Sequence, residues 1–226
     1  MKHWRMRKMG DPTNKATLFD ALARVGKALG SGKRLELLDL LAQGERSVEH
    51  LATAAGLGLT TCSAHLQTLR QAGLVATRRD GTKIHYRLAG PDVAALYALL
   101  RDVAGARNAE AAAARDAYLG PADTEAVDRD ELRRRLAAGQ VIAVDVRPAE
   151  EYAAGHIPGA ISIPLGELAE RITELPADVE VVAYCRGAYC VLSHEAVRLL
   201  ADHGRPAVRL ADGMLEWHRD QLPIAA

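Results

Sequence analysis

Between Thr17 and Leu88, hydrophobic residues first recur at the spacing of amphipathic helices and then alternate as in strands. This periodicity predicts helices over residues 17–29, 33–41 and 60–72, and Ser47 is a suitable N-cap for a short helix in between. Gly73 follows the last helix as a left-handed cap would. Asp80-Gly81 then separates two alternating segments, 74–79 and 83–88, as in a β-hairpin. The order predicts a winged helix-turn-helix domain, mainly α with a β-wing.

A long alanine-rich segment, residues 92–119, follows the predicted wing and has the periodicity of a single helix. Its hydrophobic stripe consists of Val93, Leu96, Leu99, Leu100 and Val103. A helix that is apolar on one side and flanks a small domain tends to pack against a partner. We therefore favour a dimer interface here over packing within one chain.

The second half of the chain alternates short helical and strand patterns, which is typical of an α/β domain with a mainly parallel sheet. A helix is expected from a capping sequence at Asp128 to about Ala138, and strands over residues 141–146, 161–163, 179–184 and 207–210. Gly120-Pro121 ends the preceding helix. We expect a winged-helix domain over residues 15–119, a linker over 120–126 and an α/β domain over 127–226.

The formal net charge of zero conceals an asymmetry between the two halves. Residues 1–107 carry 17 Lys and Arg against 9 Asp and Glu, whereas residues 108–226 carry 12 against 20. This difference favours a polyanionic partner for the first half alone. The basic segment 1–8 is not followed by an apolar run, and we expect a cytoplasmic protein with no membrane association.

The helix expected over residues 60–72 is the second helix of the helix-turn-helix and is therefore the one that enters the major groove of double-stranded DNA. Short hydrogen-bonding side chains occupy its outward positions, and basic side chains occupy the wing. The candidate DNA contacts are Thr60, Thr61, Ser63, His65 and Gln67 on the helix, with Arg78, Arg79 and Lys83 on the wing.

Cys185 closes the apolar strand pattern 179–184 and precedes another helical pattern. A strand, a tight loop and a helix N-terminus place a sulfur where backbone N–H groups favour the thiolate and depress the thiol pKa. The loop Arg186-Gly187-Ala188-Tyr189 is the candidate cradle for an anionic sulfur, and Cys190 ends it. The alternative is that Cys185 is a buried structural residue.

The first half resembles the ArsR family of dimeric winged-helix repressors over about residues 17–105. The segments that carry this resemblance are Leu66-Gln67-Thr68-Leu69, Ala72-Gly73-Leu74-Val75 and Tyr86-Arg87-Leu88. The resemblance implies a homodimer on a palindromic operator. Metal-sensing members carry cysteine at the position of Ser47-Val48-Glu49, and His50 and His85 stand alone, so we expect no metal site. Cys62 is interpreted as a small core residue.

The second half resembles a rhodanese domain over about residues 126–223. The matching segments are Asp145-Val146-Arg147, Glu151-Tyr152, Gly155-His156-Ile157-Pro158-Gly159-Ala160, Cys185-Arg186 and Asp212-Gly213-Met214 with Trp217. The resemblance implies that Cys185 carries sulfane sulfur as a persulfide. In this superfamily a six-residue loop is typical of the sulfur-handling members, whereas a seven-residue loop accompanies phosphatases and arsenate reductases. Counted from Cys185 to Cys190, this loop has six residues, which favours sulfur.

Two features of the loop depart from the rhodanese pattern. Gly187 stands third rather than fourth, and Cys190 replaces the sixth-position cation or threonine, which disfavours thiosulfate as the donor. Cys190 is either a resolving cysteine that forms a disulfide with Cys185 or a small buried residue. We interpret Asp145, Arg147 and His156 as structural residues that tie loops together by hydrogen bonds, in preference to a catalytic role.

Together these features predict a transcriptional repressor that senses reactive sulfur from a small donor molecule, without a cofactor. Three alternatives remain open: a sulfurtransferase with a DNA-binding domain, an arsenic-responsive regulator, and a regulator whose second domain is unreactive.

Overall fold

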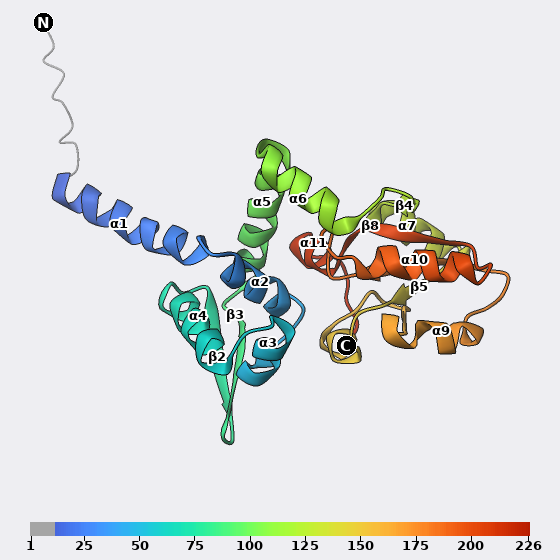
Figure 1. The fold of residues 1–226 in the computed structure, drawn as a ribbon, viewed down its shortest axis with the longest axis horizontal. Helices are drawn as coiled ribbons and strands as arrows, with labels where there is room; N and C mark the ends of the chain where they lie inside the picture. The colour runs from blue at the N-terminus through green and yellow to red at the C-terminus, as the bar shows by residue number, and fades with distance from the viewer. Residues whose placement is uncertain (1–11) are drawn as a thin grey trace, which may run out of the picture.

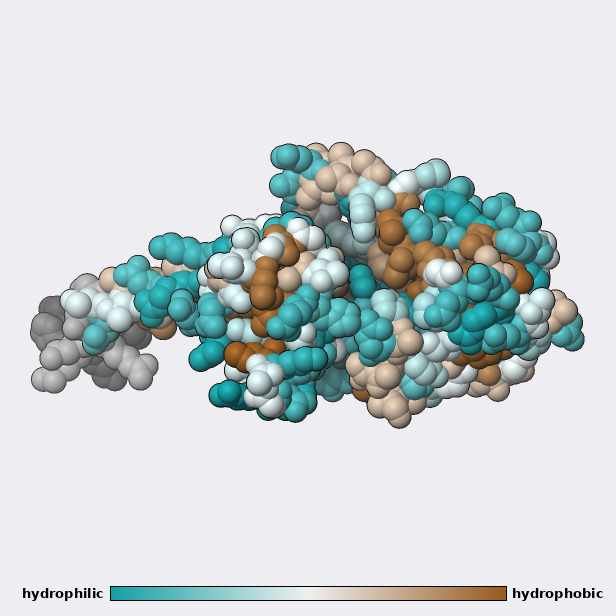
Figure 2. Space-filling view, turned by 60° about the horizontal axis from the view of Figure 1, so that its bottom comes forward, coloured by the Kyte–Doolittle hydropathy of each residue, from teal (hydrophilic) through white to brown (hydrophobic). Residues whose placement is uncertain are grey.

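The computed structural model describes residues 12–226 and contains two lobes joined by a helical segment (Figure 1). The basic segment 1–8 lies outside this range. Figure 2 shows a largely hydrophilic surface interrupted by separate hydrophobic patches. No helix of the described chain is long and apolar enough to cross a membrane.

The first lobe is the winged helix-turn-helix domain that the hydrophobic pattern predicts. Its helices are α1 (Pro12–Leu29), α2 (Gly32–Leu41), α3 (Val48–Ala54) and α4 (Leu59–Gln71), and its strands are β1 (Arg46–Ser47), β2 (Val75–Asp80) and β3 (Lys83–Leu88). The strands pair antiparallel in the order β1-β3-β2. The two-residue strand β1 has no periodicity of its own and was not predicted.

The helix-capping residues predicted from the sequence are confirmed in this lobe. The Ser47 side chain accepts a hydrogen bond from the His50 backbone N–H at the start of α3. Gly73, with φ +74°, ends α4 in the left-handed conformation that glycine adopts without strain. The wing turns at Gly81, one residue later than the predicted Asp80-Gly81 turn, since Asp80 pairs with Lys83 in the strands.

The single helix predicted over residues 92–119 is two helices, α5 (Pro91–Arg107) and α6 (Ala109–Leu119). Asn108 breaks the segment, and its side chain caps α6 by accepting from the backbone N–H groups of Glu110 and Ala111. Apart from Val93, the face of α5 that is buried within the chain is not the stripe predicted for a dimer interface. It consists of Val93, Ala94, Tyr97, Ala98 and Arg101, whereas Leu96, Leu99 and Val103 are exposed. Packing of both lobes against α5 determines which face is buried.

The second lobe is an α/β domain around a five-stranded sheet in which every pairing is parallel. The strand order is β4-β8-β7-β5-β6. The strands are β4 (Ala126–Val127), β5 (Val141–Asp145), β6 (Ile161–Ser162), β7 (Glu180–Cys185) and β8 (Ala207–Gly213). The helices are α7 (Arg129–Ala137), α8 (Ala149–Ala154), α9 (Leu168–Arg171), α10 (Leu192–Asp202) and α11 (Met214–Arg219), with 3-10 turns at Leu165–Glu167 and Ile172–Glu174.

The two lobes pack directly against each other. Leu215 of α11 is fully buried and belongs to the hydrophobic core of the winged-helix lobe. Polar contacts surround this junction: Arg46 pairs with Glu151 at 2.8 Å, and Arg147 donates to Gln43 at 3.2 Å. The α/β domain is therefore in a position to influence the helices that present the winged-helix surface.

Candidate functional site

Cys185 ends the central strand β7, and the strand's alternation determines where its sulfur lies. Val182 and Tyr184 pack into the core under α7 and α11, whereas Ala183 and Cys185 face the core under α9 and α10. The Cys185 side chain is fully buried. Its sulfur therefore lies beneath the loop 186–190 and the first turn of α10.

Polar groups of this loop and turn surround the Cys185 sulfur. Sγ lies 3.3 Å from Ser193 Oγ, and the thiol points toward the carbonyl oxygen of Cys190 at 3.5 Å. Burial raises the pKa of this thiol, but hydrogen bonds outweigh burial and lower the pKa to about 7. The donors are the thiol of Cys190, the hydroxyl of Ser193 and the backbone N–H groups of Ser193 and Gly187.

Cys190 is the protonated partner of this pair. Its hydrogen bond to Cys185 and its burial raise the pKa of the Cys190 thiol above the usual value. Both thiols are free, and Cys190 is partly exposed whereas Cys185 is not. The arrangement can supply a thiolate at Cys185 and a second thiol that reaches it.

Not every backbone N–H group of the loop is available to the Cys185 sulfur, although the sequence suggests that the whole loop surrounds it. The Ala188 N–H points to the Glu216 carboxylate at 3.5 Å, and the Cys190 N–H donates to the Gly187 carbonyl at 3.0 Å. The Arg186 guanidinium forms an ion pair with buried Glu151 at 2.6 Å. The amides of Gly187 and Ser193, rather than the whole loop, are therefore the ones directed at the Cys185 sulfur.

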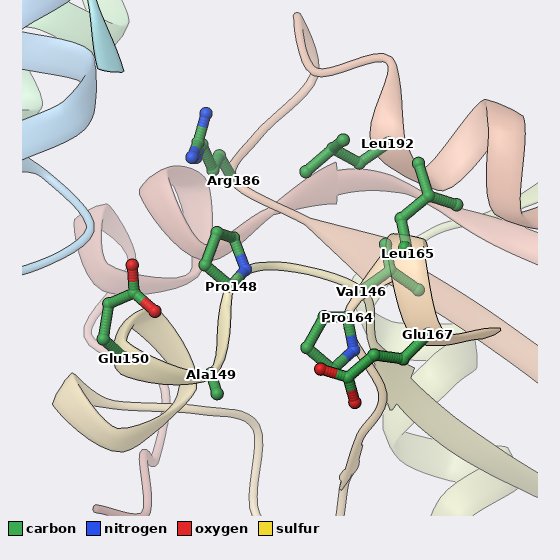
Figure 3. A pocket seen from close by; sticks show the side chains of 10 residues that line it. Val146, Pro148, Ala149, Glu150, Pro164, Leu165, Glu167, Arg186 and Leu192 are labelled. Carbon is green, nitrogen blue, oxygen red and sulfur yellow. The ribbon is translucent and has the colours of Figure 1, made fainter. Parts of the chain in front are cut away.

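A cavity of about 510 Å³ adjoins the cysteine loop (Figure 3). Arg186 and Leu192 border it on the loop side, and Pro148 and Leu165 on the opposite sides. Most of its walls are apolar. Cys185 itself does not line this cavity, so a small molecule held there would lie beside the loop and not in contact with the sulfur.

Three residues of the site were missed by the sequence reasoning. Ser193 follows the loop in the first turn of α10, and this position was itself a usable signal. Glu216 stands at the third position of α11, where a capping-box glutamate is expected, and accepts from the Gly213 N–H at 3.1 Å. Arg101 contacts the loop from α5, and nothing in the local sequence connects it to Cys185.

Asp145, Arg147 and His156, which the sequence analysis interprets as structural residues, make contacts within the α/β domain. Arg147 and Asp145 are fully buried and paired at 2.6 Å, and Arg147 also donates to the Gly155 carbonyl at 2.8 Å. His156 stacks on Tyr152 with ring centroids 3.7 Å apart. Cys62, interpreted as a core residue, is fully buried.

The eight candidate DNA-contacting side chains lie on α4 and the wing. They differ in exposure and in whether they already contact another side chain. Thr60, Thr61, Arg79 and Lys83 are exposed, while Ser63 and His65 are half-buried. Gln67 donates to the Tyr86 hydroxyl at 3.3 Å, and Arg78 forms an ion pair with Glu45 at 2.5 Å. Gln67 and Arg78 are exposed as well, so these partners orient the two side chains without covering them. Among residues 12–226, no cluster of His, Cys, Asp or Glu is arranged to hold a metal ion.

Comparison with known proteins assigns each lobe. Residues 31–77 match the model of bacterial regulatory proteins of the arsR family, and residues 128–220 match the rhodanese-like domain. The HTH-type transcriptional regulator Rv0324 of Mycobacterium tuberculosis is 57% identical over 215 residues, which is 95% of each chain. A sulfurtransferase of Allochromatium vinosum is 37% identical over 44% of this chain and 94% of that protein.

A solved winged helix-turn-helix DNA-binding domain from Mycobacterium bovis, described as homodimeric, is 55% identical and covers 46% of this chain and 95% of its own, with a TM-score of 0.42. The identity to the M. tuberculosis regulator extends across both lobes and the segment between them. The chain is therefore a transcriptional regulator that belongs to the ArsR family and carries a C-terminal rhodanese-like domain.

Proposed function

We propose that this regulator binds operator DNA as a homodimer and that reactive sulfur captured at Cys185 changes its DNA affinity. The observation that carries the proposal is the Cys185 thiol, whose lowered pKa and neighbouring Cys190 suit sulfur exchange. Its loop also touches the winged-helix lobe, since the Arg186 carbonyl accepts from Gln43 at 3.3 Å.

The chemistry is sulfur transfer followed by disulfide exchange. The Cys185 thiolate attacks a terminal sulfane sulfur of an inorganic polysulfide or an organic persulfide, and the remainder of the donor leaves with the bonding electron pair. Cys185 is then a persulfide. Cys190, after losing its proton to solvent, attacks the inner sulfur, forms the Cys185–Cys190 disulfide and releases hydrosulfide. No further oxidant is needed.

Two exposed apolar surfaces support the dimer. On α1, which extends away from the rest of the lobe (Figure 1), Leu18, Phe19 and Leu22 are 56–58% exposed. On α5, Leu96, Leu99 and Val103 are exposed. Apolar residues clustered on helices mark interaction sites. Light scattering of the full chain is expected to give twice the monomer mass of 24.3 kDa, and Phe19→Glu to shift it toward the monomer.

The main experiment measures DNA affinity before and after sulfur loading. Binding sites are selected from a random double-stranded library with reduced protein, and fluorescence anisotropy then gives the dissociation constant with and without sodium polysulfide. Typical allosteric coupling predicts a change of about fivefold or more for the wild type. Intact mass in parallel should show a reductant-reversible gain of one sulfur or loss of two hydrogens.

Matched cysteine variants make this result decisive. Cys185→Ser should abolish both the mass change and the affinity change, whereas Cys62→Ala should keep both. Cys190→Ser should retain the added sulfur as a longer-lived persulfide. An equal response in wild type and Cys185→Ser would refute the proposal.

A sulfurtransferase activity is the second candidate, favoured by the similarity of residues in this lobe to the A. vinosum sulfurtransferase. Multiple turnovers with a sulfane donor and a thiol acceptor would support it. A single loading event per chain would favour the sensor, and burial of Cys185 agrees with slow turnover.

A further inference from the structure

Tyr189 of the cysteine loop extends out of its own lobe and reaches α5. Its hydroxyl donates to the Arg101 carbonyl at 3.1 Å. The Arg101 guanidinium lies over the Tyr189 ring, 4.3 Å from its centroid, as in a cation–π contact. The loop that covers Cys185 is thus attached to a helix of the winged-helix lobe.

Gly105 on α5 lies directly beside this hydroxyl, which occupies the space that a side chain at this position would need. A Cβ atom built at Gly105 would lie 2.4 Å from the Tyr189 hydroxyl oxygen, closer than a Cβ can approach, and 3.7 Å from the ring carbon that bears it. Glycine inside a helix costs about 1 kcal/mol relative to alanine. The close approach of Tyr189 is the feature of the structure that accounts for glycine at this position.

Arg101 holds the same loop from a second direction. It is 7% exposed and pairs with Glu216 at 2.9 Å. The same carboxylate group accepts from the Gly213 N–H at 3.1 Å and faces the Ala188 N–H at 3.5 Å. A single arginine of α5 therefore contacts the tyrosine side chain of the loop and, through Glu216, the loop backbone.

We propose that Arg101, Gly105 and Tyr189 form a latch, in which α5 holds the cysteine loop closed over Cys185. Cys185 is fully buried, so any reagent reaches its sulfur only when the loop opens. Cys190, which must move to bond with Cys185, is the residue next to Tyr189. Sulfur chemistry at the pair would therefore disturb the latch and α5. This last step rests on the proposed function, whereas the closure of the loop does not.

The test of closure is the rate at which iodoacetamide alkylates Cys185 in the full chain, followed by peptide mass spectrometry. Tyr189→Phe removes the hydroxyl and its hydrogen bond, and the rate is expected to rise about fivefold. Gly105→Ala places a methyl group where the hydroxyl lies, and a similar rise is expected. In the double variant the methyl group no longer meets a hydroxyl, so the rate should equal that of Tyr189→Phe alone.

Gly26→Ala on α1 is the matched control, because a Cβ there meets nothing within 4 Å. It should leave the alkylation rate unchanged. Urea unfolding of each variant checks that the fold is intact, and if Gly105→Ala fails to fold, Tyr189→Phe alone decides. A Gly105→Ala rate equal to that of Gly26→Ala, or independent effects that multiply in the double variant, would overturn the latch.

Hydrogen exchange tests the link to α5 separately. Treatment of the full chain with sodium polysulfide should speed amide exchange over residues 97–107 in the wild type but not in Cys185→Ser. Unchanged exchange in a wild type that carries the added sulfur would refute the link. Iodoacetamide needs neither a sulfur donor nor DNA, so the alkylation result stands even if the sensing proposal fails.

Discussion

Cys62 and Cys185 are both fully buried, one in each lobe, yet their thiols are affected in opposite directions. Burial raises the pKa of Cys62, which lies inside α4 with its sulfur 3.9 Å from the Val48 carbonyl. Hydrogen bonds lower the pKa of Cys185 to about 7 in spite of its burial. The supply of hydrogen-bond donors, rather than depth, decides whether the pKa of a buried thiol is lowered or raised.

The difference in donors comes from secondary structure. Cys62 lies in the first turn of α4, but its side chain points into the apolar core of the winged-helix lobe, and the polar atom its thiol faces is the Val48 carbonyl, which is an acceptor. Cys185 lies at the end of a strand, opposite a loop and the first turn of α10, where helical N–H groups have no partner within the helix. A thiolate can therefore be stabilised at the end of β7 but not inside α4.

The largest expected effect is on reactivity. With iodoacetamide at pH 8, Cys185 should be alkylated on the order of 100 times faster than Cys62, because loop opening exposes one thiol whereas the other needs unfolding of the core. Peptide mapping of the native protein over time measures both rates. Similar rates for the two thiols would show that the different surroundings of Cys62 and Cys185 do not affect their reactivity.

The position of Cys185 between a strand and a helix could be predicted from the sequence because the information is local. The strand β7, the loop and the following helix are contiguous, and β7 is an almost continuous apolar run, as expected for a strand that is buried on both faces of a parallel sheet. The order of helices and the β-hairpin of the first lobe could be predicted for the same reason. The contact of Tyr189 with α5 could not be predicted, since it joins two lobes that are far apart in the sequence.

The residues that escaped prediction are those defined by contacts between the lobes. Arg101 was part of a helix whose apolar stripe alone was considered, and its buried position results from packing against α11. Gly105 is unremarkable within an alanine-rich helix until the Tyr189 hydroxyl is placed beside it. No periodicity encodes a contact between residues this far apart in the chain.

The second prediction compares stability. Cys62→Ser should lower the free energy of unfolding by about 1–3 kcal/mol, because a hydroxyl is buried among apolar side chains. Cys185→Ser should cost less than about 1 kcal/mol, since Ser193 and loop carbonyls can bond the new hydroxyl. Urea denaturation measures both, and a larger loss at Cys185 would show that its surroundings are not prepared for a polar group.

The smallest expected effect isolates one donor. Ser193→Ala removes the hydroxyl 3.3 Å from the Cys185 sulfur. Because that hydrogen bond favours the thiolate, its loss should raise the pKa of Cys185 by about one unit, or about 1.4 kcal/mol. The alkylation rate of the wild type should be half-maximal near pH 7 and that of the variant near pH 8, with similar plateaus above. Gly105→Ala should instead raise the plateau and leave the midpoint unchanged, because opening the loop and ionising the thiol are separate steps. A shift of the midpoint in both variants would mean that the latch and the hydrogen bonds act as one unit.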